Sequence, residues 1–182
     1  NIYELVYDTM FDLQFDGSFK PELAESWETS EDGLTLTYKI RQGVMWHDGT
    51  PLTANDIAFT FNLYRDDENF AYLQSNMAYF ESITATDDAT LEIKLTELIP
   101  NVESKMTVAY VLPEHIFKDA PVEFENAEMI GTGPFKMAEY KQGEFVRLEK
   151  NADYWTDPPK VDEVIFQTFG SQDVLVQAIK TG

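Results

Sequence analysis

Residues 23–61 constrain the fold more than any other segment, because their hydrophobic period changes within a short distance from strand-like to helix-like. In residues 34–41 apolar and polar side chains alternate strictly, which predicts a strand with one buried face. Residues 47–51 then form a polar turn pattern with Gly and Pro in turn-forming roles. Thr53, with Asp56 three residues later, has the pattern of a helix N-cap, and apolar residues then recur at helical spacing. The segment therefore predicts a strand, a tight turn and an amphipathic helix.

Similar patterns continue along the chain and predict a mixed fold of the α/β class. We expect a second helix over residues 70–79, followed by a β-hairpin of residues 83–86 and 91–95. A closing helix is expected after Ser171, with Ser171 as its N-cap. Trp27 is expected to be a core residue. Further strands are predicted over residues 107–112, 135–140, 145–149 and 161–169.

The charge balance excludes two classes of partner. The chain has 182 residues, of which 13 are basic and 33 acidic, so its formal net charge is −20 at pH 7. Such a charge repels nucleic acid and anionic lipid surfaces, and neither is an expected partner. The sequence has no cysteine, which excludes thiol catalysis, cysteine-based zinc sites and disulfides. It also has no apolar run long enough to span a membrane.

Catalytic and metal-binding patterns are weak throughout the chain. His47 and His115 are the only histidines, and no second ligand lies at metal-binding spacing from either. We interpret His47 as part of a structural turn, His115 as a surface residue, and the Gly-rich step at 131–133 as a structural turn rather than a nucleotide-binding loop. We therefore expect no catalytic residue, no cofactor and no metal ion. The alternative from another class is a glycoside hydrolase that uses a pair of carboxylates.

Aromatic residues carry the stronger functional signal. Their side chains supply flat apolar area, and the tyrosines add a polar tip, which suits the lining of a cleft for an elongated ligand. Each of them, taken alone, is better explained as a core residue. The residues considered for this role are Tyr3, Tyr7, Phe70, Tyr72, Tyr79, Tyr110, Tyr154 and Trp155.

Five short motifs occur in one order along the chain. They are residues 1–8 (NIYELVYD), 21–27 (PELAESW), 46–49 (WHDG), 131–135 (GTGPF) and 151–155 (NADYW), the last followed by a Pro–Asp–Phe pattern at 158–166. With these motifs the sequence resembles the extracellular solute-binding proteins of ABC importers, specifically the large family 5 that takes up peptides and nickel. The resemblance covers nearly the whole chain.

The resemblance implies a lobe of the periplasmic-binding-protein type, of the peptide-binding class, with an inserted small α/β subdomain. Residues 1–43 are then the first part of the main sheet subdomain, residues 44–143 the small mixed α/β subdomain, and residues 144–182 the return to the main sheet. Members of the family continue beyond the closing helix into a second lobe. We therefore expect this chain to be an N-terminal fragment from which the second lobe is absent.

The same resemblance implies a function and a location. The expected protein is a non-enzymatic, monomeric substrate-binding component of an ABC importer. It binds peptides of the oligopeptide or dipeptide type outside the cytoplasmic membrane and delivers them to the permease subunits. The expected location is extracytoplasmic, as a periplasmic protein or a cell-surface lipoprotein, with the signal sequence outside this chain.

Two alternatives remain within the binding-protein class. The same scaffold can carry a nickel chelate, an oligosaccharide or an opine, although the absence of arginine between Arg65 and Arg147 disfavours an anionic metal chelate. The domain can also serve mainly to bind another protein, as the receptor lobe of a sensor.

By resemblance, the ligand contacts fall on three parts of the chain. The opening motif lies near the base of the cleft, the helix after residue 69 begins with ligand-facing residues, and the segment from residue 107 lines the cleft floor. Tyr154 and Trp155 are assigned a structural role, and the isolated fragment is expected to bind ligand only weakly. The expected ligand-binding residues are Tyr3, Asn69, Phe70, Tyr72, Thr107 and Tyr110.

Overall fold

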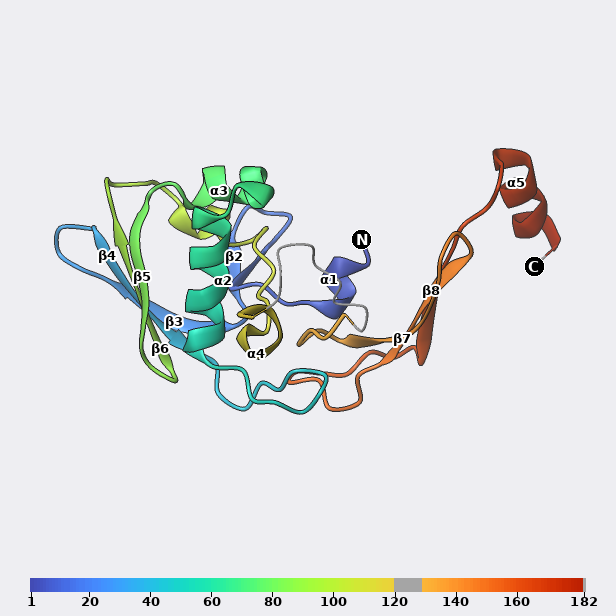
Figure 1. Ribbon diagram of the computed structural model, residues 1–182, viewed down its shortest axis with the longest axis horizontal. Helices are drawn as coiled ribbons and strands as arrows, with labels where there is room; N and C mark the ends of the chain where they lie inside the picture. The colour runs from blue at the N-terminus through green and yellow to red at the C-terminus, as the bar shows by residue number, and fades with distance from the viewer. Residues whose placement is uncertain (120–128, 182) are drawn as a thin grey trace.

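The computed structural model describes residues 1–119 and 129–181, which form three antiparallel sheets and several helices (Figure 1). The helices are α1 (Tyr3–Val6), α2 (Ala54–Asp66), α3 (Ala71–Met77), α4 (Glu114–Phe117) and α5 (Gln172–Thr181), with 3-10 turns at Glu68–Phe70 and Val102–Lys105. The strands are β1 (Phe11–Leu13), β2 (Phe19–Pro21), β3 (Ala24–Thr29), β4 (Thr35–Ile40), β5 (Phe80–Asp87), β6 (Thr90–Leu95), β7 (Phe135–Lys141), β8 (Phe145–Lys150) and β9 (Glu163–Gln167). The predicted mixed α/β class is confirmed.

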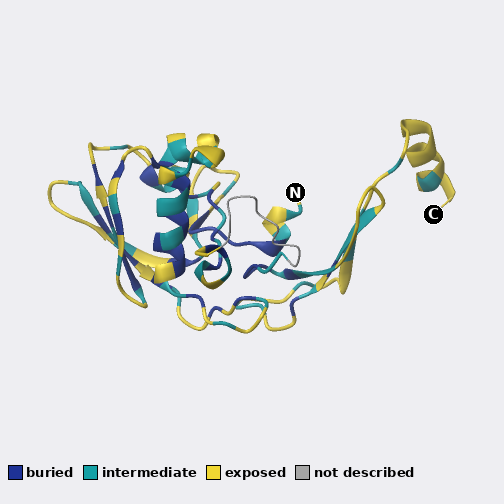
Figure 2. Cartoon of the chain, in the orientation of Figure 1, coloured by how far each residue is buried: buried dark blue, intermediate teal, exposed yellow. Residues whose placement is uncertain are grey.

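A four-stranded sheet with the order β3-β4-β6-β5 carries helix α2 and holds most of the core (Figure 1). In its strand β4, the alternating residues Leu36, Tyr38 and Ile40 are buried, as a strand with one buried face requires. They belong to the same core cluster as Ile57 and Phe61, which lie on the apolar face of α2. Figure 2 shows this core as the dark blue stretches of α2 and of the sheet. The predicted strand and helix are therefore both confirmed.

Helix α2 begins where the sequence predicts, and its cap is reciprocal. Thr53 Oγ1 accepts a hydrogen bond from the Asn55 backbone N–H at 3.2 Å. The Asp56 carboxylate accepts one from the Thr53 backbone N–H at 2.9 Å. Asp56 is buried, and its other carboxylate oxygen accepts a hydrogen bond from the Glu114 backbone N–H at 3.0 Å. One side chain thus caps α2 and also attaches a distant segment to it.

Several predicted elements differ in extent. The helix predicted over residues 70–79 is the 3-10 turn Glu68–Phe70 followed by α3, and the strand predicted over 161–169 is the shorter β9. Residues 107–112 form no strand, which corrects the prediction made from their apolar character. Trp27 is half-buried rather than a full core residue, and its ring packs edge-on against Phe11 at 5.0 Å between centroids.

The three-stranded sheet β7-β8-β9 leads away from the larger sheet to α5, which lies at the far end of the molecule (Figure 1). Strand pairing crosses both predicted subdomain bounds, because β4 pairs with β6 across 43/44 and β7 pairs with β8 across 143/144. The division into subdomains at these two bounds stays a prediction. None of the helices within residues 1–119 and 129–181 has the length and apolar character needed to cross a membrane.

Candidate functional site

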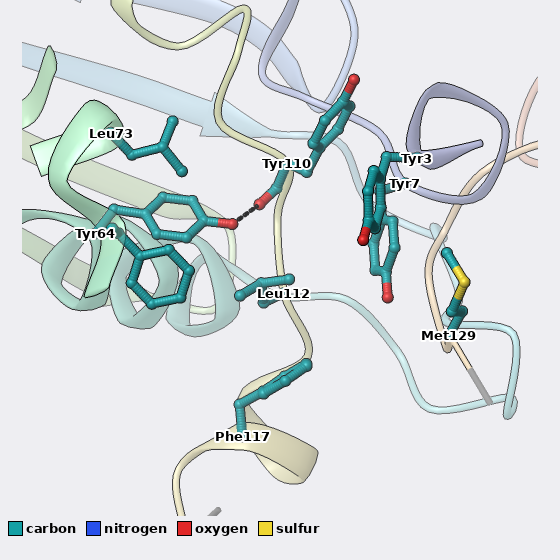
Figure 3. A pocket seen from close by; sticks show the side chains of 9 residues that line it. Tyr3, Tyr7, Tyr64, Leu73, Tyr110, Leu112, Phe117 and Met129 are labelled. Atoms are coloured by element: carbon teal, nitrogen blue, oxygen red, sulfur yellow. Dashed lines mark hydrogen bonds between the residues drawn. The ribbon is translucent and has the colours of Figure 1, made fainter. Parts of the chain in front are cut away.

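A cavity of about 420 Å³ opens between helix α2 and helix α1 (Figure 3). Its walls come from four parts of the chain that are distant in sequence: the α1 region, the end of α2 with the start of α3, the extended segment before α4 together with α4 itself, and residue 129. All of the lining side chains in the described part of the chain are uncharged. They are Tyr3, Tyr7, Tyr64, Phe70, Leu73, Tyr110, Leu112, Phe117 and Met129.

Aromatic rings form most of this surface. Tyr3, Tyr7 and Tyr110 form a triangle in which the ring centroids lie 6.2–6.4 Å apart. On the opposite side, the rings of Tyr64 and Phe70 lie 4.9 Å apart. These separations are typical of favourable aromatic pairs, so the rings support one another as a preformed apolar wall.

A hydrogen bond links the two sides of the cavity. The Tyr64 hydroxyl donates to the Tyr110 backbone carbonyl at 2.8 Å, drawn as the dashed line in Figure 3. Burial raises the pKa of both tyrosines above the usual value, so both hydroxyls are neutral at physiological pH. The cavity therefore offers apolar area and neutral hydroxyls rather than charge.

A second recess, of about 480 Å³, shares Tyr7 and Tyr110 with the first cavity and differs from it in charge. Burial, followed by the nearby charges of Asp8 and Asp12, raises the pKa of Glu22 to about 7. Thr107 also lines this recess. Its acidic lining residues are Glu4, Asp8, Asp12 and Glu22.

Asp8 is buried at the junction of distant segments. Its carboxylate accepts hydrogen bonds from Trp155 Nε1 at 2.8 Å, Thr132 Oγ1 at 2.9 Å and the Tyr154 hydroxyl at 3.0 Å. Burial raises the pKa of Asp8 even though these three donors act in the opposite direction. The contacts give Tyr154 and Trp155 the structural role that the sequence predicts.

The Gly-rich step is held by His47. The Gly131 backbone N–H donates to His47 Nδ1 at 3.2 Å, so Nε2 carries the proton and donates to the Gly133 carbonyl at 3.0 Å. Gly133 N–H donates to the Val6 carbonyl at 2.8 Å, and a Cβ atom at Gly131 would overlap that same carbonyl oxygen. Glycine is therefore required for this close approach to α1. His47 lies in a turn, and these contacts give it and residues 131–133 a structural role.

The structure brings some of the six predicted ligand-binding residues together. Tyr3, Phe70 and Tyr110 meet in the uncharged cavity, and Thr107 lies in the neighbouring acidic recess. Asn69 lines neither, and its side-chain amide donates to Asp67 Oδ1 at 2.8 Å. Tyr72 also lines neither, and 71% of its surface is exposed.

Sequence reasoning missed five of the described cavity residues and left a sixth without an assigned contact. The sixth is Tyr7, which was considered among the cleft aromatics and follows Tyr3 by four residues, a helical spacing that signals a shared face. Tyr64 is buried in the core cluster and Leu73 packs against it, so the sequence does not distinguish these lining positions from other core positions. The missed residues are Tyr64, Leu73, Leu112, Phe117 and Met129.

Comparison with known proteins agrees with this architecture. The family model described as bacterial extracellular solute-binding proteins, family 5 middle, matches residues 18–182. A Brucella ovis protein described as an ABC transporter peptide-binding protein is 35% identical over 167 residues, which cover 88% of this chain and 32% of the relative. The chain thus spans about a third of the length of that curated relative.

Two solved structures superpose over nearly the whole chain. One is the oligopeptide-binding protein AppA from Bacillus subtilis in complex with a nonapeptide, with a TM-score of 0.88 and 27% identity over 100% of this chain and 37% of AppA. The other is NikZ from Campylobacter jejuni in complex with Ni(L-His), with a TM-score of 0.89 and 26% identity over 98% of this chain and 36% of NikZ. The chain belongs to the bacterial extracellular solute-binding proteins of family 5.

Proposed function

We propose that the protein containing this chain is the substrate-binding component of an ABC importer and that it captures peptides outside the cytoplasmic membrane. The observation that carries the proposal is the uncharged, tyrosine-rich cavity, which is built from distant segments on a scaffold like that of a nonapeptide-binding protein. Its volume of about 420 Å³ falls within the roughly 300–1,000 Å³ typical of small-ligand sites.

The cavity suits a peptide for a physical reason. Peptides share their backbone groups, whereas their side chains vary, so a broad receptor binds the backbone through hydrogen bonds and accepts side chains in roomy pockets. An apolar wall with neutral hydroxyls can accommodate many side chains without requiring a particular charge. We assign the contacts in this chain to Tyr3, Phe70 and Tyr110, with Thr107 at the border of the acidic recess.

The rest of the proposed cycle involves parts outside this chain. Ligand lies between this lobe and a second lobe, and closure of the lobes buries the ligand and forms the surface that the permease subunits recognise. The protein acts as a monomer, by binding rather than by catalysis, in the periplasm or as a cell-surface lipoprotein.

A nickel chelate is the second candidate, favoured by the likeness to NikZ. The two TM-scores, 0.89 for NikZ and 0.88 for AppA, do not separate the candidates, so the choice depends on the cavity. Within residues 1–119 and 129–181, the side chains that line it include no histidine, arginine or carboxylate that would pair with a charged metal complex. Across residues 1–119 and 129–181, no three His, Cys, Asp or Glu side chains gather in a metal-binding group. These features favour a peptide.

Native mass spectrometry of the full-length protein, purified gently enough to retain a bound ligand, tests the proposal. A series of added masses that resolves into short peptides after denaturation is the expected result. A single non-peptide mass or a nickel adduct would replace the proposed ligand, and turnover of chromogenic glycosides that depends on one carboxylate would overturn the binding-protein proposal itself.

A further inference from the structure

The segment that forms the cavity wall between residues 110 and 114 is held by the side chains of a helix instead of by a neighbouring strand. Tyr64 donates to the Tyr110 carbonyl at 2.8 Å, and Thr60 Oγ1 accepts from the Leu112 backbone N–H at 2.9 Å. Asp56, one turn earlier, accepts from the Glu114 N–H at 3.0 Å. We infer that Thr60 and Tyr64 are positioning residues that fix the wall of the ligand cavity.

The spacing of these contacts explains why a helix can replace a strand here. Residues 56, 60 and 64 are four apart, so each step along α2 advances about 6 Å along one face. Residues 114, 112 and 110 are two apart, so each step of extended chain advances about 6.6 Å. The two repeats match closely over three contacts, and the numbering runs in opposite directions along the helix and the segment.

One more backbone group of the segment is paired on its other side. The Val111 N–H donates to the Asp8 backbone carbonyl at 3.1 Å. Thr60 is buried, and its hydroxyl hydrogen faces the Asp56 carbonyl at 2.7 Å and the Leu112 carbonyl at 3.2 Å. Buried polar groups that lack a hydrogen-bond partner are costly, so these contacts stabilise the segment. Residues 110 and 112 are held from the side of α2, and residue 111 is held from the side of Asp8.

The consequence for binding rests on the proposed function. Tyr110 and Leu112, whose backbone groups Tyr64 and Thr60 hold, are themselves lining residues of the cavity. Loss of one of these hydroxyls leaves a backbone group of the wall unpaired and frees that wall to shift. The cavity then loses its fit to apolar side chains, which changes selectivity between ligands rather than the affinity for all ligands equally.

The test measures two affinities in the full-length protein by titration calorimetry. Trileucine places apolar side chains in the cavity, whereas triglycine offers only backbone, so their affinity ratio reports the shape of the cavity. We expect Tyr64→Phe and Thr60→Val each to lower this ratio by about three- to tenfold, the effect of one buried hydrogen bond. Thr60→Ser, which keeps the hydroxyl, restores the ratio.

Tyr38→Phe is the matched control. Tyr38 is buried like Tyr64, but its hydroxyl has no hydrogen-bond partner among the residues that the structure describes. Its removal should leave the affinity ratio unchanged. An equal loss of affinity for both peptides in Tyr64→Phe, or a ratio that falls as far in Tyr38→Phe, would overturn the positioning role.

A readout without ligand separates this inference from the proposed function. The Leu112 amide should exchange with solvent faster in Thr60→Val than in wild type, and at the wild-type rate in Thr60→Ser. Unchanged exchange in Thr60→Val would contradict the inference. If wild-type protein binds neither peptide, the proposed function fails, and the exchange of the Leu112 amide still decides whether Thr60 holds the wall.

Discussion

The indole nitrogen of Trp155 donates a 2.8 Å hydrogen bond to the carboxylate of Asp8, across a sequence separation of 147 residues. Thr132 and Tyr154 donate to the same carboxylate, so two segments from the second half of the described chain meet at one residue beside the first helix. The carboxylate is acceptor-only when ionised, which suits a site with three donors.

We predict that Asp8→Asn lowers the free energy of unfolding by about 1–3 kcal/mol, because the amide turns an NH₂ donor toward groups that are themselves donors. Denaturant unfolding, followed by the fluorescence of Trp155 and its neighbours, measures the change. Asp12→Asn is the control: this exposed carboxylate borders the same recess, and its replacement should have little effect. Equal free energies of unfolding for Asp8→Asn and Asp12→Asn would contradict the structural role of the Asp8 carboxylate.

Glu22 should make the protein less stable as the pH rises. Burial and the charges of Asp8 and Asp12 raise its pKa from 4.5 to about 7 in the folded protein, so the native state holds this proton more tightly than the unfolded state. Its favourable contribution is complete below pH 4.5 and is lost as the pH rises through 7. Glu22→Gln should remove this part of the pH dependence and stabilise the protein above pH 7 by on the order of 1–2 kcal/mol, allowing for solvent screening.

Unfolding free energies of wild type and Glu22→Gln between pH 4 and 8 test this prediction. The difference between the two proteins should grow with pH through this range. A difference that stays constant would show that Glu22 has the same affinity for its proton in the folded and unfolded states.

His47 should have the opposite effect and make the protein less stable as the pH falls. Burial lowers the pKa of its imidazole below the usual 6.5, and its Nδ1 must be unprotonated to accept the Gly131 N–H. The unfolded state therefore binds this proton more readily, so the contribution of His47 is complete above pH 6.5 and is lost as the pH falls below that value. The charged neighbours Lys136 and Asp48 act on its pKa in opposite directions.

Comparing the pH dependence of the melting temperature in wild type and His47→Gln tests this prediction. The non-titrating variant should lose less stability than wild type between pH 6.5 and 5. His115→Gln serves as the control, because the other histidine is exposed, as a surface residue was predicted to be, and bonds Asp48 at 2.7 Å instead of the Gly-rich step. If wild type and His47→Gln lose stability in parallel, His47 is not the acid-sensitive group.

The sequence correctly predicted the helices and strands that depend on interactions between residues close in sequence. The alternation in residues 34–41, the Thr53 cap and the hairpin of β5 and β6 each depend on neighbours close in sequence, and each lies where predicted. The strand predicted over residues 107–112 was wrong. Their apolar character resembles that of a strand, but their hydrogen-bond partners include side chains of helix α2, which no strand pattern in the sequence reveals.

The candidate site was only partly predictable for a related reason. Tyr3, Phe70 and Tyr110 were identified from the family resemblance, because no sequence pattern distinguishes a cavity wall from a core face. Tyr64 illustrates the difficulty: it repeats at helical spacing like a core residue, and both its burial and its hydroxyl contact depend on a segment 46 residues away. Phe70 lines the cavity and Tyr72 does not, and this difference likewise depends on the direction of each side chain in three dimensions.

The different positions of Phe70 and Tyr72 allow a direct test of whether the ligand binds in this cavity. Calorimetric titration of trileucine into full-length wild type, Phe70→Ala and Tyr72→Ala compares two aromatic residues that are near neighbours in sequence, of which only Phe70 lines the cavity. We predict that Phe70→Ala weakens binding by about ten- to a hundredfold, the effect of removing one buried aromatic contact, and that Tyr72→Ala leaves it unchanged. Equal losses in the two variants, or a loss confined to Tyr72→Ala, would contradict the placement of the ligand in this cavity.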